Sequence, residues 1–160
     1  MRSVTAAVWA CAFATLGVVA SRAQTTSFAG TWIIDWSKTD AANAALGSPS
    51  QPHGATVTQT IRQDAQSLTV ERAPAPPRSY RLDGSATTYR TNGGATQVVR
   101  VSWDGARLKF VITSGVGDAA KVATKVWELD HGDLLETTTW PPANGAAPER
   151  TAEVSRRVSR

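Results

Sequence analysis

Cysteine is nearly missing from this sequence, since the chain of 160 residues contains only one, Cys11. Cys11 lies in an N-terminal segment that has the features of a secretory signal, so residues 24–160 contain no thiol. This absence excludes structural disulfide bonds, thiol catalysis and zinc–thiolate sites. The folded part of the chain has to be stabilised by non-covalent packing alone.

The N-terminal segment combines a basic start, an apolar run and small residues at a cleavage point. Arg2 precedes an apolar run over residues 4–20, and Ser21 and Ala23 fit the third and first positions before a cut. We interpret residues 1–23 as a signal peptide, with cleavage after Ala20 as an alternative. An uncleaved membrane anchor is the other alternative, although the run is slightly short for a span and rich in alanine. The prediction is export, to the periplasm or the extracellular medium.

An excess of charge of one sign is missing as well. Of 17 lysines and arginines, Arg2 and Arg22 belong to the signal, which leaves 15 against 13 acidic residues. No basic stripe runs through the body, so nucleic acid is not expected as a partner. No second long apolar run follows, so we expect no membrane span after cleavage. Residues 24–160 suffice for one domain with one core, which we expect to be monomeric.

Helical periodicity is rare after the signal, where short segments rich in Val, Thr, Trp and Tyr are separated by turn residues. Alternation of apolar and polar positions in such segments predicts β-strands. Turn sequences of two to four residues, such as "WDGA" and "LDGS", predict hairpins between them. The predicted strands cover residues 29–36, 55–63, 67–73, 78–83, 86–91, 96–104, 106–113, 120–130, 133–140 and 149–158.

Strands joined by short turns form an antiparallel meander. Ten strands in one flat sheet would expose an apolar face and two long edges, and closing the sheet removes both. We therefore predict an all-β fold, an up-and-down meander closed into a barrel of eight to ten strands. A two-sheet sandwich is the alternative, but it usually needs longer crossovers than this chain offers.

The longest connection, residues 37–54, contains an alanine-rich stretch from Asp40 to Leu46. Thr39 or Ser37 could cap a short helix there, and Gly47 could end it. A loop rich in serine and proline is the alternative. The first predicted strand is therefore followed either by a short helix or by an irregular loop.

Several predicted strands carry a polar residue within an apolar row. Gln59 lies between Val57 and Ile61, and Glu136 follows Leu134. An unpaired buried polar group costs about 1–3 kcal/mol or more, so such residues fit a lumen that holds water or a ligand. The alternative is that β-bulges shift the alternation and turn them outward. The candidate lumen residues are Trp36, Gln59, Tyr80, Tyr89, Arg100, Trp127 and Glu136.

The stretch "FAGTWIIDWSKTD", residues 28–40, resembles the Gly-x-Trp opening of lipocalins and of small secreted bacterial lipocalin-like proteins. The resemblance implies a barrel of eight to ten strands that Gly30 and Trp32 help to close at one end. It also implies an arginine from the last strand packed on Trp32. Arg156 and Arg157 are the candidates, and their opposite parity allows only one of them to do this.

Catalytic and metal-binding sets are missing too. The two histidines, His53 and His131, fall in separate loops, and there is no phosphate loop, nucleophile elbow or dinucleotide fingerprint. We therefore expect no enzyme activity, no metal and no cofactor. The predicted function is the binding of a small apolar or amphipathic molecule in the lumen. The alternative is a structural or protein-interaction module of the cell envelope, with a barrel filled by its own side chains.

Overall fold

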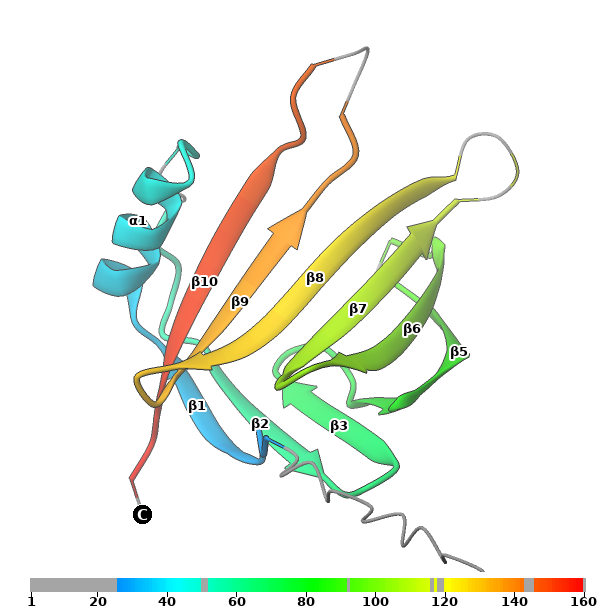
Figure 1. Cartoon of the computed structure of the whole chain (residues 1–160), viewed down its shortest axis with the longest axis horizontal. Coiled ribbons are helices and arrows are strands. Elements are labelled where there is room, and N and C mark those ends of the chain that lie inside the picture. The colour runs from blue at the N-terminus through cyan, green and yellow to red at the C-terminus, as the bar shows by residue number, and fades with distance from the viewer. Residues whose placement is uncertain are drawn as a thin grey trace, which may run out of the picture.

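The computed structural model describes residues 26–49, 52–91, 93–115, 117, 120–142 and 146–159, and the predicted signal lies outside them. Ten strands and one helix follow one another along the described chain (Figure 1). The elements are β1 (Gly30–Ile34), α1 (Trp36–Ala45), β2 (Thr58–Gln63), β3 (Ser67–Arg72), β4 (Arg78–Arg81), β5 (Asp83–Arg90), β6 (Thr96–Asp104), β7 (Arg107–Ser114), β8 (Lys121–Asp130), β9 (Asp133–Thr139) and β10 (Arg150–Arg157).

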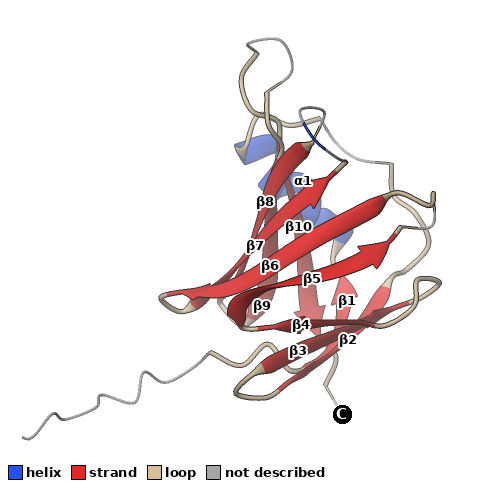
Figure 2. Ribbon diagram, turned by 90° about the vertical axis from the view of Figure 1, so that its right-hand side faces the viewer, coloured by secondary structure: helices blue, strands red, loops and turns tan. Residues whose placement is uncertain are grey.

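All ten strands form one antiparallel sheet that curls into a nearly closed barrel (Figure 2). Their order in the sheet is β4-β3-β2-β1-β10-β9-β8-β7-β6-β5. Consecutive strands are therefore neighbours, apart from β4 and β5, and the first strand pairs with the last. Each of the ten predicted strands is present, and the prediction of an all-β up-and-down barrel is confirmed.

The barrel has a gap between β4 and β5, because these two end strands of the sheet do not pair with each other. The prediction of a hairpin at "LDGS" is wrong, because only Leu82 separates the two strands. The N–H of Leu82 still donates to Gln66 O beside β3, whereas Asp83 already pairs with Ser102 of β6. A bulge between Asp83 and Ala86 then bends β5. The chain passes directly from one end of the sheet to the other, without a turn that could pair β4 with β5.

The core fills one end of the barrel. Successive strands alternate in direction, so the first residues of the odd-numbered strands meet at the same end. Their apolar residues there are completely buried: Phe28, which precedes β1, and Trp32, Leu68, Leu108 and Leu134. The indole nitrogen of Trp32 donates to Phe28 O at 2.9 Å, so this buried donor is satisfied. The opposite end of the barrel contains the second halves of the same strands.

Helix α1 confirms the prediction of a short helix, but it begins four residues before the predicted start. Asp35, not Thr39 or Ser37, is the N-cap, and its side chain accepts from the N–H of Lys38 at 3.1 Å. The cap ends β1 at Ile34 and starts the helix at Trp36. Gly47 adopts a φ of +70° just after the helix and ends it, as predicted. In the described part of the chain, no helix has the length and apolarity needed to cross a membrane.

The helix completes an unpaired strand edge. β1 pairs with β10 only over Ser155–Arg157, so the edge of β10 beyond these residues lacks a neighbouring strand. Asn43 replaces that neighbour: its side-chain amide donates to Ala152 O at 2.9 Å and accepts from Ala152 N at 2.8 Å. Two residues along, the N–H of Val154 donates to the hydroxyl of Thr39 at 2.9 Å. Asn43 and Thr39 are buried, and they satisfy backbone groups that a strand would otherwise pair.

Asn43→Ala tests this edge contact. The substitution improves the intrinsic helix propensity of α1, yet it leaves the buried N–H and C=O of Ala152 unpaired. We expect the free energy of unfolding, measured with urea, to fall by about 1–3 kcal/mol. Ser37→Ala, at an exposed position of the same helix, is the control and should change it by less than about 0.5 kcal/mol. Equal stability of the two variants would contradict the edge-completing role.

Candidate functional site

A cavity of about 330 Å³ lies inside the barrel, at the end opposite the core. Its wall is made mainly by the second halves of odd-numbered strands and the first halves of even-numbered ones, which meet at this end, and Tyr80, Phe110 and Trp127 of the core cluster form its inner boundary. It combines apolar and aromatic side chains with several polar groups. The lining residues are Gln59, Val70, Arg72, Ala75, Pro76, Arg78, Tyr80, Tyr89, Gln97, Val99, Phe110, Ile112, Lys125, Trp127, Glu136, Thr138 and Trp140.

The apolar wall is built from interlocking rings. Phe110 and Trp127, from the paired strands β7 and β8, have ring centroids 4.8 Å apart. Tyr80 meets Phe110 edge-on, with centroids at 5.7 Å and planes at 88°. Such tilted and edge-to-face pairs are the arrangements that aromatic rings prefer. These three side chains therefore form a continuous apolar stretch of the cavity wall.

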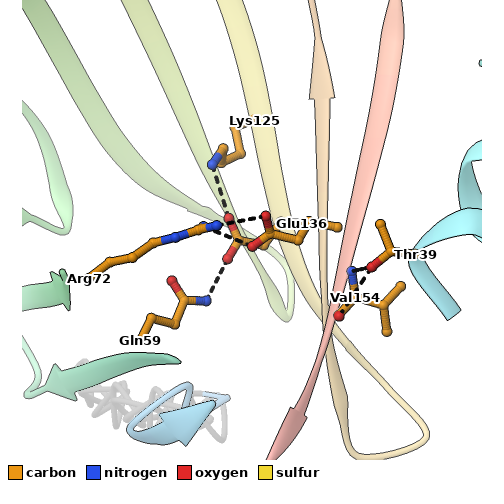
Figure 3. Close-up of polar contacts among 7 residues, drawn as sticks. Thr39, Gln59, Arg72, Lys125, Glu136 and Val154 are labelled. Atoms are coloured by element: carbon orange, nitrogen blue, oxygen red, sulfur yellow. Dashed lines mark hydrogen bonds and ion pairs between the residues drawn. The ribbon is translucent and has the colours of Figure 1, made fainter. Parts of the chain in front are cut away.

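Glu136 is the centre of the polar side of the cavity (Figure 3). This residue of β9 is only 3% exposed, and its two oxygens take different partners. Oε1 accepts from Gln59 Nε2 at 2.7 Å, and Oε2 accepts from Lys125 Nζ at 3.0 Å. Gln59 comes from β2 and Lys125 from β8, so the carboxylate links strands on both sides of β9.

A second ion pair crosses the barrel beside the first. Arg72 at the end of β3 makes a bidentate contact with Glu153 of β10, with N–O distances of 2.8 and 3.0 Å. Glu153 lies directly opposite Glu136 in the β9–β10 register. The two pairs form one group of alternating charge inside the barrel, and its net charge is zero.

The charges of this group hold one another ionised. Burial disfavours the charged form of Glu136, but the ammonium of Lys125 and the amide of Gln59 outweigh it, so the pKa of Glu136 lies below its usual value. The carboxylate of Glu136 in turn raises the pKa of Lys125, against the effect of burial. Burial works against the charge of Arg72 too, but Glu153 leaves the pKa of that guanidinium raised.

A third polar group lies where β4 and β5 diverge. Arg78, the first residue of β4, places its guanidinium carbon 4.1 Å from the centroid of the Tyr89 ring of β5. Tyr80, two residues further on the same face of β4, meets Tyr89 edge-on with centroids 6.5 Å apart. Side chains therefore bridge the two strands that the backbone does not pair.

Five of the seven candidate lumen residues line this cavity: Gln59, Tyr80, Tyr89, Trp127 and Glu136. Arg100 does not, and its placement in the lumen is wrong. Arg100 is exposed on the outer face of β6, whereas its neighbours Val99 and Val101 are buried. Both faces of β6 carry valine, and the polar residue within one of them marks the outside of the barrel.

Trp36 does not line the cavity either. The predicted strand placed it on the face of Trp32, but the Asp35 cap stops the alternation and makes Trp36 the first residue of α1. Its ring stacks on His53, with centroids 5.2 Å apart. Trp36 lines a separate hollow of about 490 Å³, which shares Lys125 and Glu136 with the barrel cavity. The polar group thus lies between two hollows.

At the closed end, the structure distinguishes between the two candidate arginines. Arg157 pairs in register with Trp32, and its guanidinium carbon lies 4.6 Å from the centroid of the indole. Arg156 pairs with Ile33, so its side chain takes the other face of the sheet and is exposed. Gly30 has a φ of +146°, a conformation that side chains disfavour, and it lies beside the side chains of Arg157 and Trp32.

Sequence reasoning missed Arg72, Arg78 and Lys125. Each is a cation in an apolar row: Arg72 follows Leu68 and Val70, and Lys125 precedes Trp127. The signal that identified Gln59 and Glu136 was therefore present at these positions. The contact between Arg72 and Glu153, 81 residues apart, is visible only in the fold.

The histidines take no part in the cavity. His131 occupies a turn between β8 and β9 with a φ of +50°, and its side chain is 96% exposed. Among the described residues, no group of three or more His, Cys, Asp or Glu side chains is placed to hold a metal ion.

No family model and no curated protein sequence matches this chain. Solved structures do resemble it. A secretary abundant heat soluble protein from Ramazzottius varieornatus aligns with a TM-score of 0.57 at 17% identity, over 85% of this chain and 98% of that one. Zebrafish ileal bile acid-binding protein, complexed with cholic acid, gives 0.55 at 20% identity, over 82% and 98%.

A third similar structure is fatty-acid-binding protein 1 of Echinococcus granulosus, with a TM-score of 0.54 at 12% identity, over 82% of this chain and 98% of that one. At these identities the likeness establishes the fold. The chain has the calycin-type, lipocalin-like barrel fold, with ten antiparallel strands and one short helix after the first.

Lys125→Met tests the buried pair. The substitution leaves the carboxylate of Glu136 buried without its cation. We expect the free energy of unfolding at pH 7 to fall by about 2–4 kcal/mol, less than for a fully buried pair because Lys125 is partly exposed. The double variant Lys125→Met, Glu136→Leu removes both charges and should recover most of this loss. A double variant as unstable as the single one would contradict the pairing.

The same pair gives a pH dependence. Because the folded state lowers the pKa of Glu136, the stabilisation is fully present above the ordinary value of 4.5. It is lost as the pH falls through the lower, folded-state pKa. In Lys125→Met the burial of Glu136 is no longer offset, so protonation relieves the penalty. Urea midpoints of the wild-type and single-variant proteins should therefore converge between pH 7 and pH 4.

Proposed function

We propose that this protein binds one small apolar or amphipathic molecule in the barrel cavity. The observation that carries the proposal is the cavity itself, about 330 Å³ lined by aromatic and aliphatic side chains together with a few polar groups. Ligand pockets have volumes of roughly 300–1,000 Å³ and combine apolar walls with a few placed polar groups. Binding without chemistry suits a site whose buried carboxylates are each neutralised by a paired cation.

Two further features support ligand binding. The indole nitrogen of Trp127, on the cavity wall, is buried and has no hydrogen-bond partner among the described residues, and a ligand acceptor could satisfy it. Similar barrels include a bile acid-binding protein complexed with cholic acid and a fatty-acid-binding protein. The alternative, a barrel filled by its own side chains, is disfavoured by the volume that those side chains leave open.

Filling the cavity tests the proposal. Ile112 is a lining residue of β7, and Val111, next to it, projects from the other face. We expect Ile112→Trp to weaken binding of decanol at least about tenfold, measured by calorimetry, since the new ring takes up ligand space. Val111→Trp is the matched control and should bind within about twofold of wild type. Equal binding by both variants, or no binding by the wild-type protein, would overturn the proposal.

We also propose that the protein acts after export, as the composition of residues 1–23 indicates. The intact mass of the exported protein, expressed with its own leader, tests this. A chain beginning at Gln24 is the expected result, and one beginning at Ser21 would place the cut after Ala20. A full-length chain retained in the membrane fraction would support the anchor instead.

A further inference from the structure

The cations of the cavity wall differ in their electrostatic surroundings. Arg72 is bound by Glu153, and Lys125 by Glu136, so each already has a carboxylate within hydrogen-bonding distance. A ligand carboxylate placed beside them would meet two fixed negative charges in a low-dielectric interior. The paired group therefore repels an ionised acid about as strongly as it attracts one, and it suits uncharged polar groups.

Arg78 is different. Among the described residues, no carboxylate lies within 4.0 Å of its guanidinium nitrogens. The side chain is half-buried and held over the ring of Tyr89, so part of its hydration is already lost. A positioned, partly dehydrated guanidinium without a counter-ion is a strong donor group for a carboxylate or a similar oxyanion.

A second donor accompanies it. Tyr80 lies two residues along β4 on the same face and is 8% exposed. Burial raises the pKa of the Tyr80 hydroxyl well above its usual value, although the nearby charge of Arg78 acts against this. The group consequently remains an O–H donor at all physiological pH values. Tyr80 and Arg78 both line the cavity, and their strand, β4, borders the gap between β4 and β5.

We propose that Arg78 and Tyr80 form an anion subsite at the β4–β5 gap, which takes the acidic group of an amphipathic ligand whose apolar body fills the cavity. The subsite rests on the proposed binding function and adds the ligand class and its orientation. The apolar body lies against Phe110, Trp127 and Ile112, beside the neutral group of paired charges, and the acidic group lies at Arg78. The preferred ligand is therefore a small monoanionic amphiphile.

Two probes with the same hydrocarbon chain, decanoate and decanol, separate the subsite from the cavity. Arg78→Gln should weaken decanoate binding about tenfold, as expected for losing a hydrogen bond to a charged group, and leave decanol within about twofold. Arg81→Gln is the matched control on the same strand, because Arg81 is exposed and paired with Asp83. It should leave the affinity for both probes unchanged. Tyr80→Phe should weaken decanoate alone, by a smaller factor.

The outcomes are distinguishable. If Arg78→Gln weakens both probes equally, or neither, the subsite is wrong while the cavity function stands. If decanoate is instead lost in Glu136→Gln or Lys125→Met and unaffected in Arg78→Gln, the acidic group enters the interior, and the proposed orientation is reversed. Failure of the wild-type protein to bind either probe removes the proposed function and the subsite with it. Arg78→Lys retains the cation and should keep most of the selectivity, even if Arg78→Gln folds poorly.

Discussion

The pairing of β10 is the constraint on which the rest of the structure depends. One edge of β10 pairs with β9 from Arg150 to Ser155, but the other edge pairs with β1 over only three residues. Beyond Ser155, this edge of β10 therefore has no neighbouring strand, and side chains make the contacts there instead. Asn43 and Thr39 satisfy the free backbone of β10 from outside, and Arg72 reaches Glu153 from inside. Both devices exist because β1 ends at the Asp35 cap.

The same geometry explains why charges lie inside a small barrel. An ion pair in an apolar core is often no more stable than packed hydrocarbon, so its presence calls for a reason. Here Glu136 is buried, but Lys125 keeps 30% of its side-chain surface exposed, so the cost of dehydrating the pair is reduced on the lysine side. They set the polarity of the cavity wall, which a core of leucine could not do. Trp127 is the cross-strand neighbour of Glu136, and Phe110 is that of Lys125, so apolar and charged groups adjoin one another on the cavity wall.

The strands could be predicted from sequence because their signals are local. Alternation along each strand and glycine, aspartate or asparagine in the turns were sufficient for ten strands and their antiparallel order. The apolar rows interrupted by Gln59 and Glu136 identified lumen residues for the same reason. The prediction that Trp36 faces the lumen failed because the capping residue Asp35 ends the strand and changes the periodicity from two to 3.6 residues. The prediction that Arg100 faces the lumen failed because both faces of β6 carry enough apolar residues to be the inner face.

The ion pairs across the barrel could not be predicted from the sequence. Which cation meets which carboxylate depends on strands far apart in the chain, as with Arg72 and Glu153. The gap between β4 and β5 was also hidden, because "LDGS" has the composition of a hairpin turn and one residue of spacing decides against it. Distances between strands, and not the composition of any one strand, decide which cation of the cavity wall has no carboxylate partner among the described residues.

The contact between Trp32 and Arg157 also has a consequence for how the chain folds. β1 lies near the beginning of the chain and β10 at its end, so their pairing closes a loop that includes nearly all other strands. The hairpins from β5 to β10 need only local contacts and can form early, whereas closure of the barrel has the largest entropic cost. Until β10 is present, β1 therefore keeps one edge unpaired, whereas β2 can already pair with both β1 and β3. Closure of the barrel is therefore the last step of folding, and it depends on three residue pairs between β1 and β10.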